Sequence, residues 1–272
     1  MTTDLFIRNS GYVSEKVQQR LTEITILIAG CGLGSYLAEG LVRFGCHHLV
    51  LVDHDTIDSH NLNRQDFLYG DIGRLKTEAL AERLRLINPD ATIECVNERV
   101  SAVNAQDLIK EVDLVIDTID FLSMEDLIPF YEQCYLQKRT VISALNAGFG
   151  AVAFYIPGAI QTRNWFTRIF GIEECEVNAP KEYAFYFERL LTTLGPNLPE
   201  EVTRNLMGVV ELMKEKRPCP ASQISVGAFA AASLCVTIVH RMLSGQTLVE
   251  LPYAMALDMN RIAAIPAFSL AP

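Results

Sequence analysis

Residues 24–35 read ITILIAGCGLGS, and this stretch decides the fold. Its first six residues are uncharged and mostly β-branched, which is typical of a strand buried on both faces of a parallel sheet. A glycine-rich turn follows directly, and residues 36–44 then have the pattern of a helix. A strand, a glycine turn and a helix in this order let backbone N–H groups and the helix N-terminus receive a phosphate. The stretch therefore predicts a nucleotide site in a doubly wound α/β sheet.

The second predicted strand, residues 48–52, ends at Asp53. An acidic residue about twenty positions after the glycines is where nucleotide-binding folds hold a ribose hydroxyl. Gly34 comes one residue earlier than the usual third glycine, and Ser35, which is also small, stands at that place. The alternative is a plain tight turn without a ligand. We expect three glycines to let the backbone approach the phosphates: Gly30, Gly32 and Gly34.

Two cations follow the acidic residue within one polar region. Residues 61–65 read NLNRQ and residues 71–76 read DIGRLK, which places Arg64 and Lys76 close to the nucleotide site in sequence. Lys76 begins a helix predicted over residues 76–86, where the helix dipole disfavours a cation unless a phosphate lies nearby. The alternative is a solvated loop with ordinary surface charge. Because Arg64 and Lys76 follow the acidic residue in this order, we favour a site that acts on the phosphates of its nucleotide.

This order of motifs resembles the ThiF/MoeB superfamily, which includes the adenylation domains of ubiquitin-activating enzymes. Besides the motifs above, it includes Asn88-Pro89 and the sequence DTID at residues 117–120. The resemblance is close over residues 8–150 and loose over residues 219–245. It implies ATP-dependent adenylation of a carboxylate, usually the C-terminus of a small protein or peptide, with release of pyrophosphate.

The resemblance also implies roles for individual residues. Phosphate charge would be neutralised by Arg64, by Lys76 and, across a homodimer, by an arginine of the N-terminal arm, which Arg8 matches. Such an arginine finger stabilises the charge that develops on a transferring phosphoryl group. The alternative for Arg8 is an exposed arginine near a terminus. The implied nucleotide contacts are polar side chains: Asp53 for the ribose, together with Asp55, Asn61 and Gln65.

Mg²⁺ is implied at Asp120, which follows a strand predicted over residues 114–116. Ligands of an open α/β sheet gather at the carboxyl ends of strands, so Asp117 and Asp120 are expected to face the glycine turn. Relatives often carry asparagine next to this carboxylate, whereas this chain has Phe121. A second interpretation of Asp117 is that it caps the following turn.

Composition limits the class of protein. With 272 residues, 50% of them hydrophobic, the chain can bury a substantial core. A net charge of −10 argues against a nucleic-acid partner, because phosphate backbones require clustered lysine and arginine. Seven cysteines without a C-x-x-C pair indicate reduced thiols in a cytoplasmic protein without structural zinc. We expect no secretory signal and no membrane span, and we interpret residues 224–239 as a buried helix.

The expected fold is a Rossmann-like doubly wound sheet with helices on both faces. The short turn at residues 146–150 predicts a hairpin to a strand at 151–156, so the C-terminal strands should be antiparallel. The expected parallel strands are residues 24–29, 48–52, 93–96, 114–116 and 140–144, and the expected edge strands are 248–252 and 253–258. Further expected helices are residues 105–111, 183–194, 200–215 and 222–243.

We expect three regions within one compact unit. Residues 1–22 form an arm and a helix capped by Ser14, residues 23–157 form the nucleotide-binding part, and residues 158–272 form a substrate and dimerisation part with a helical insertion.

Cys175 and Cys219 are candidates for a catalytic thiol, because some members of the superfamily pass the acyl group to a cysteine in such a loop. Adjacent glutamates would raise the pKa of Cys175. Cys219 has an arginine nearby and precedes a helix expected from residue 221 or 222, which favours the thiolate. An inert packed cysteine is the alternative for both.

Three other functions stay open. An enzyme resembling the tRNA threonylcarbamoyladenosine dehydratase would adenylate a carboxylate on tRNA and cyclise it. An NAD-dependent oxidoreductase would use the glycine turn but leave Arg64 and Lys76 without a task. A catalytically inactive subunit could pair with an active one, which the presence of Arg64, Lys76 and Asp120 disfavours.

Overall fold

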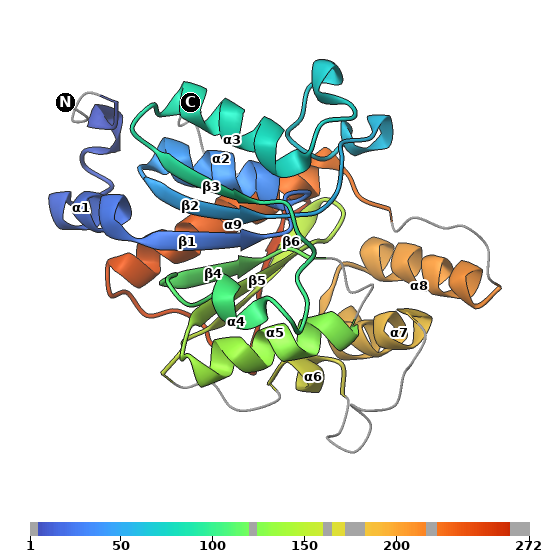
Figure 1. The fold of residues 1–272 in the computed structure, drawn as a ribbon. Helices are drawn as coiled ribbons and strands as arrows, with labels where there is room; N and C mark the ends of the chain where they lie inside the picture. Colours follow the sequence, from blue (N-terminus) through green and yellow to red (C-terminus); the bar gives the residue numbers. More distant parts are fainter. Residues whose placement is uncertain (1–4, 120–123, 160–164, 172–182, 216–221, 262–272) are drawn as a thin grey trace, which may run out of the picture.

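The computed structural model describes residues 5–119, 124–159, 165–171, 183–215 and 222–261 (Figure 1). The strands are β1 Thr25–Ala29, β2 His48–Val52, β3 Thr92–Val96, β4 Leu114–Asp117, β5 Thr140–Asn146, β6 Gly150–Ile156 and β7 Met255–Asp258. They form one sheet in the order β3-β2-β1-β4-β5-β6-β7. β1 to β5 pair in parallel, whereas β6 and β7 pair antiparallel. The expected sheet, parallel first and antiparallel at its C-terminal edge, is confirmed.

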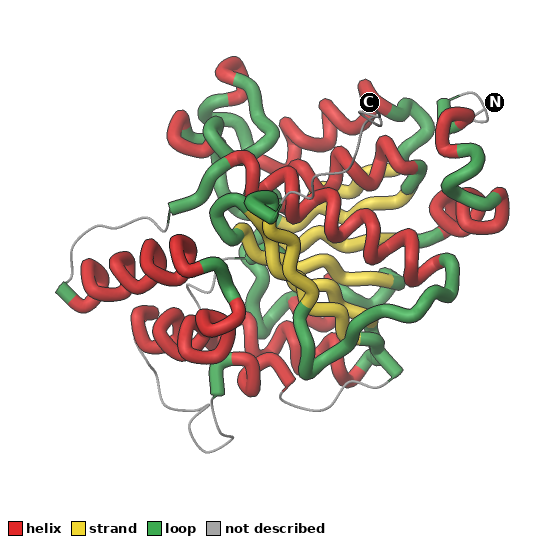
Figure 2. The backbone as a smooth tube through the Cα atoms, turned by 180° about the vertical axis from the view of Figure 1, so that it is seen from behind, coloured by secondary structure: helices red, strands yellow, loops and turns green. Residues whose placement is uncertain are grey.

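Helices cover both faces of this sheet (Figures 1 and 2). Their bounds are α1 Glu15–Glu23, α2 Gly34–Phe44, α3 Lys76–Ile87, α4 Ala105–Leu108, α5 Met124–Leu136, α6 Trp165–Ile169, α7 Tyr183–Leu194, α8 Glu200–Lys214 and α9 Ser225–Leu243. In β1, Ile26 and Ile28 belong to the core under α2, α3 and α9, whereas Leu27 and Ala29 belong to the core under α4, α5 and α6. Both faces of β1 are buried, which explains why this strand has no polar face.

The N-terminal arm, residues 5–14, leads into α1 as expected. The Ser14 hydroxyl caps α1 by accepting a hydrogen bond from the N–H of Val17 at 3.3 Å. Asn9 holds the arm against the end of α2, because its Nδ2 donates to the carbonyl of Phe44 at 3.0 Å. α1 lies at the end of the sheet opposite to α7 and α8 (Figure 1).

α9 packs against β5, β6 and α2 through small side chains. A Cβ atom on Gly227 would lie 2.1 Å from Asn146 Oδ1 and 2.4 Å from the carbonyl oxygen of Gly148, so a larger residue would collide. Within the part of the chain that the structure describes, α9 has the length and apolar composition of a membrane span, and half of that window is buried in the fold. This burial agrees with the interpretation of α9 as a core helix, although it begins at Ser225 rather than at residue 222.

Two expectations about secondary structure are wrong, and α5 was not expected. Residues 248–252 form no strand, because β7 pairs with β6 only over Met255–Asp258 and Pro252 has no N–H to donate. α4 ends early, at Leu108. α5 is an additional helix, and Pro129 inside it interrupts the pattern by which a helix is predicted from sequence.

Candidate active site

A cavity of about 470 Å³ lies at the carboxyl ends of the central parallel strands. Gly30 follows β1, Asp53 follows β2 and Thr118 follows β4, and all three line the cavity. Residues of α7 and α8 contribute to its wall from the other side. Parallel strands end at one edge of a sheet, so residues far apart in sequence meet here.

The glycine turn orients Asp53 through backbone amides. Gly30 has a φ of +90°, and a Cβ atom there would lie 3.0 Å from the backbone of Thr118, so glycine is required. The N–H of Cys31 donates to Asp53 Oδ2 at 2.7 Å, and the N–H of Asp55 donates to Asp53 Oδ1 at 2.9 Å. Each oxygen of Asp53 keeps a further lone pair, so the carboxylate can still accept from a ligand.

Gly32 and Gly34 have different surroundings. Gly32 lines the cavity, and a Cβ atom on it would lie 3.0 Å from Gln65 Nε2. Gly34 lies in the first turn of α2 and does not line the cavity. A Cβ atom on Gly34 would lie 2.6 Å from Ile28 Cγ2, so the missing side chain lets α2 pack closely on β1. The structure therefore brings Gly30 and Gly32, but not Gly34, to the cavity wall.

Ser35 has a role that the sequence analysis missed. Its buried hydroxyl donates to the carbonyl of Gly32 at 2.7 Å and accepts from the N–H of Asp66 at 2.8 Å. The side chain thereby ties the loop that follows Gln65 to the glycine turn. Small size alone suggested packing at this position, and only the hydroxyl group hinted at a hydrogen bond.

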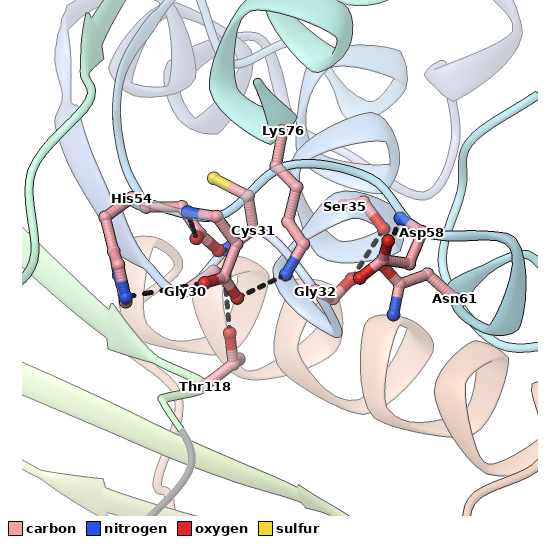
Figure 3. A network of polar contacts seen from close by, with 11 residues as sticks. Gly30, Cys31, Gly32, Ser35, His54, Asp58, Asn61, Lys76 and Thr118 are labelled. Atoms are coloured by element: carbon pink, nitrogen blue, oxygen red, sulfur yellow. Dashed lines mark hydrogen bonds and ion pairs between the residues drawn. The ribbon is translucent and has the colours of Figure 1, made fainter. Parts of the chain in front are cut away.

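Lys76 is 6% exposed and extends from α3 toward the glycine turn (Figure 3). Its Nζ lies 2.7 Å from Asp55 Oδ2, and both residues line the cavity. Burial by itself would raise the pKa of Asp55, but the hydrogen bond and the charge of Lys76 lower it below its ordinary value. The ion pair holds a cation in the first turn of α3, where the helix dipole alone would disfavour it.

Arg64, Asn61 and Gln65 lie on one loop and line the same cavity. Arg64 donates from Nε to Gln223 Oε1 at 2.9 Å and from Nη1 to the carbonyl of His60 at 2.7 Å. Gln65 is 8% exposed, and within the described ranges its buried Oε1 has no hydrogen-bond partner. A buried acceptor without a donor costs free energy, which a ligand that donates to it would recover.

The remaining predicted residues are Arg8, Asp120, Cys175 and Cys219. Arg8 is exposed and belongs to the N-terminal arm, at the end of the sheet away from α7 and α8. Arg8 does not line the cavity of its own chain. Asp120, Cys175 and Cys219 lie outside the described residues.

Asp117 does not line the cavity, and the expectation that it does is wrong. Its carboxylate accepts hydrogen bonds from the hydroxyls of Tyr131 and Ser143 inside the core. The N–H of Ile119 donates to Asp117 Oδ1 at 3.0 Å, so the residue caps the turn after β4. Burial raises the pKa of Asp117 to about 6, although these three hydrogen bonds oppose the shift.

Comparison with known proteins yields one family. The model of the ThiF family matches residues 7–268. A tRNA threonylcarbamoyladenosine dehydratase of Haemophilus influenzae is 38% identical over 132 residues, which are 47% of this chain and 50% of that protein. A probable molybdopterin-synthase adenylyltransferase of Gracilaria tenuistipitata var. liui is 33% identical over 140 residues, which are 50% of this chain and 39% of that protein.

The crystal structure of Escherichia coli MccB with ATP has the same fold, with a TM-score of 0.62 at 20% identity. This similarity covers 91% of this chain and 64% of the MccB chain. The matched region spans half, or less, of the length of these two curated relatives. Because the family model covers nearly the whole sequence, the chain belongs to the ThiF family.

Proposed function

We propose that this protein is an ATP-dependent adenylyltransferase that activates a carboxylate, namely the C-terminus of a small protein or peptide. One observation carries the proposal: Arg64 and Lys76 line the same cavity as the glycine turn and Asp53. In the reaction, a carboxylate oxygen bonds to the α-phosphorus of ATP while the bond from that phosphorus to pyrophosphate breaks. The products are an acyl-adenylate and pyrophosphate. The carboxylate is already the nucleophile, so the step requires no general base.

Catalysis of this step depends mainly on positioning and on neutralising charge, because two anions must approach each other. Lys76 is fixed by Asp55, and the Arg64 guanidinium is fixed by Gln223. Both cations are therefore oriented before ATP binds. In this proposal Asp53 binds the ribose, and the backbone at Gly30 and Gly32 approaches the phosphates. The remaining amides, Asn61 and Gln65, orient the phosphates.

Mg²⁺ would be held by Asp120 and the phosphates, since this ion favours one or two carboxylates together with phosphate oxygens. Thr118 and Ile119, which directly precede Asp120 in the sequence, line the cavity. Asp53, His54 and Asp55 form another group whose ligand atoms lie within 4.8 Å of one another. Their carboxylates already accept from backbone amides and from Lys76, so this group fits the ion less well. A bound Mg²⁺ would neutralise phosphate charge.

The proposal includes a cytoplasmic homodimer in which Arg8 of one subunit serves the cavity of the other. Arg8 is exposed and does not line the cavity of its own chain, which supports a role across subunits rather than within one chain. A guanidinium supplied in this way stabilises charge on the phosphates that react.

ATP–pyrophosphate exchange tests the proposal. We expect exchange that depends on a peptide carboxylate, and we expect Arg64→Ala to slow it by about 100-fold or more. Arg43→Ala is the matched control, because Arg43 pairs with Glu39 at 2.7 Å and does not line the cavity. Equal exchange by Arg64→Ala and wild type would show that Arg64 has no part in the reaction.

A second candidate function is a reaction on tRNA. The 38% identity to a tRNA threonylcarbamoyladenosine dehydratase favours it, although the net charge of −10 opposes nucleic-acid binding. Exchange that requires tRNA bearing a carboxylate, and not peptide, would select this candidate.

Two other classes are tested by simpler measurements. Titration with NAD and with ATP separates an oxidoreductase from an adenylyltransferase, because the oxidoreductase would bind NAD in preference. Exchange by the purified protein without a second kind of subunit excludes the possibility that the chain is a catalytically inactive subunit.

A further inference from the structure

The cavity has a second part whose chemistry differs from that of the nucleotide part. Four of its side chains come from α7 at positions i, i+3, i+4 and i+7, which lie on one face of a helix. Of the others, Leu198 lies in the short link that precedes α8, and Leu206 lies in the middle of α8. We name this set the leucine wall: Phe187, Leu190, Leu191, Leu194, Leu198 and Leu206.

The order of the strands separates the leucine wall from the expected position of the nucleotide base. Asp53 follows β2, so a ribose held by Asp53, with the base joined to it, is expected on the β2–β3 side of β1. The leucine wall lies on the other side, against the turn between β5 and β6. A Cβ atom on Gly148 in this turn would lie 3.3 Å from Val202 Cγ2 of α8, and Leu190 shares its core with Val152 of β6.

Hydrogen bonds connect the phosphate-binding loop to the β5–β6 turn. Arg64 Nε donates to Gln223 Oε1 at 2.9 Å, and Asn63 Nδ2 donates to the carbonyl of Gln223 at 3.2 Å. The next residue, Ile224, accepts from Asn146 Nδ2 at 3.0 Å. Arg64, the cation proposed to bind phosphate, is thereby linked to the β5–β6 turn by hydrogen bonds through Gln223 and Ile224. A carboxylate beside Arg64 would therefore lie in the cavity that the leucine wall also lines.

We propose that the activated carboxylate belongs to a C-terminal residue with a large apolar side chain, such as leucine, which packs against the leucine wall. The inference rests on the proposed adenylation and names the substrate class of the same site. A terminal glycine has no side chain to cover the wall. A terminal aspartate would lose its hydration beside six apolar side chains, which offer it no hydrogen bond.

The expected discrimination follows from the size of the side chain. Hydrophobic pockets separate substrates by about 10-fold or more for each methylene group. The C-terminal leucine should therefore exceed glycine in kcat/KM by at least about 10-fold. Aspartate should be the poorest of the three.

The test is ATP–pyrophosphate exchange with tetrapeptides that differ only in the last residue: Ala-Ala-Ala-Leu, Ala-Ala-Ala-Gly and Ala-Ala-Ala-Asp. Isocaproate supplies the leucine side chain on a free acid without the peptide. The expected order is leucine, glycine, aspartate, with isocaproate below the leucine peptide. Equal rates, a preference for glycine, or a preference for isocaproate would overturn the proposal.

Variants of α8 test whether the leucine wall causes the preference for the leucine peptide. Leu206→Gln should lower kcat/KM for the leucine peptide by about 10-fold and leave that for the glycine peptide and the KM for ATP unchanged. Met207→Gln is the matched control, because Met207 is 41% exposed and does not line the cavity. Leu206→Phe keeps the site apolar but reduces its volume, so it should shift the preference from leucine toward valine. An equal effect of Leu206→Gln on all peptides would contradict the proposal.

A binding measurement separates this inference from the proposed reaction. Calorimetry measures the affinity of each peptide in the presence of a non-hydrolysable ATP analogue. Tighter binding of the leucine peptide without exchange would refute adenylation but would support the binding of the C-terminal side chain by the leucine wall. Exchange with all peptides at equal affinity would support adenylation but would refute the binding of the C-terminal side chain by the leucine wall.

Discussion

Replacing Lys76 by methionine removes one positive charge from the cavity and changes little else. The lysine side chain is 6% exposed, and methionine is flexible and apolar enough to fill the same space. Lys76 Nζ lies 2.7 Å from Asp55 Oδ2, so the variant also deprives that carboxylate of its lysine partner. Two losses should add at the phosphates: an attractive charge disappears and a repulsive charge is no longer neutralised.

The expected effect on the reaction is larger than the effect on folding. A donor aimed at charge in the transition state contributes about 10²–10³ in rate. The ion pair contributes about 1 kcal/mol or less to stability, because the Asp55 side chain is 52% exposed and water screens the pair. We expect exchange to fall by about 100-fold or more while the free energy of unfolding stays within about 1 kcal/mol of the wild-type value.

Exchange assays and ATP calorimetry on three variants measure these effects. Adding Asp55→Asn to Lys76→Met should recover part of the ATP affinity, because it removes the unpaired negative charge. Arg74→Met is the matched control, because Arg74 pairs with Asp71 at 2.8 Å and does not line the cavity. Wild-type exchange by Lys76→Met would refute the reasoning, and so would a double variant that binds ATP more weakly than Lys76→Met.

Two further predictions concern pH and subunit exchange. Burial and the neighbouring Glu39 raise the pKa of Asp66 to about 7, so the folded chain keeps a proton that the unfolded chain loses near pH 4. Raising the pH from about 4 to about 7 should lower the Asp66 contribution to the free energy of unfolding, and Asp66→Asn should remove this slope. Urea unfolding across that range measures it, and an unchanged slope in the variant would contradict the assignment. Mixing equal amounts of inactive Arg8→Ala and inactive Arg64→Ala should restore about a quarter of wild-type exchange, because half of all dimers are then heterodimers and each heterodimer carries one intact site of two. No restoration in subunits shown to have exchanged would exclude a role of Arg8 across the dimer.

The sequence by itself determined the elements that depend on local pattern. β2 and α7 have the predicted bounds, His48–Val52 and Tyr183–Leu194, because the alternation and the spacing of apolar residues report burial directly. The order of motifs likewise indicated the family and a nucleotide site after β1. Prediction failed where one residue disturbed the pattern, as Pro129 does inside α5, or where pairing depended on a distant strand, as at residues 248–252.

Only the tertiary structure decided which side chains share a site. Asp117 looked like a cavity residue, but Tyr131 holds its carboxylate inside the core. Arg64 meets Gln223 across a large sequence separation, and the leucine wall faces the cavity because α7 and α8 pack at the carboxyl ends of the strands. The physical reason is that a local pattern records how deeply a residue is buried, whereas its partner is set by the packing of elements remote in sequence.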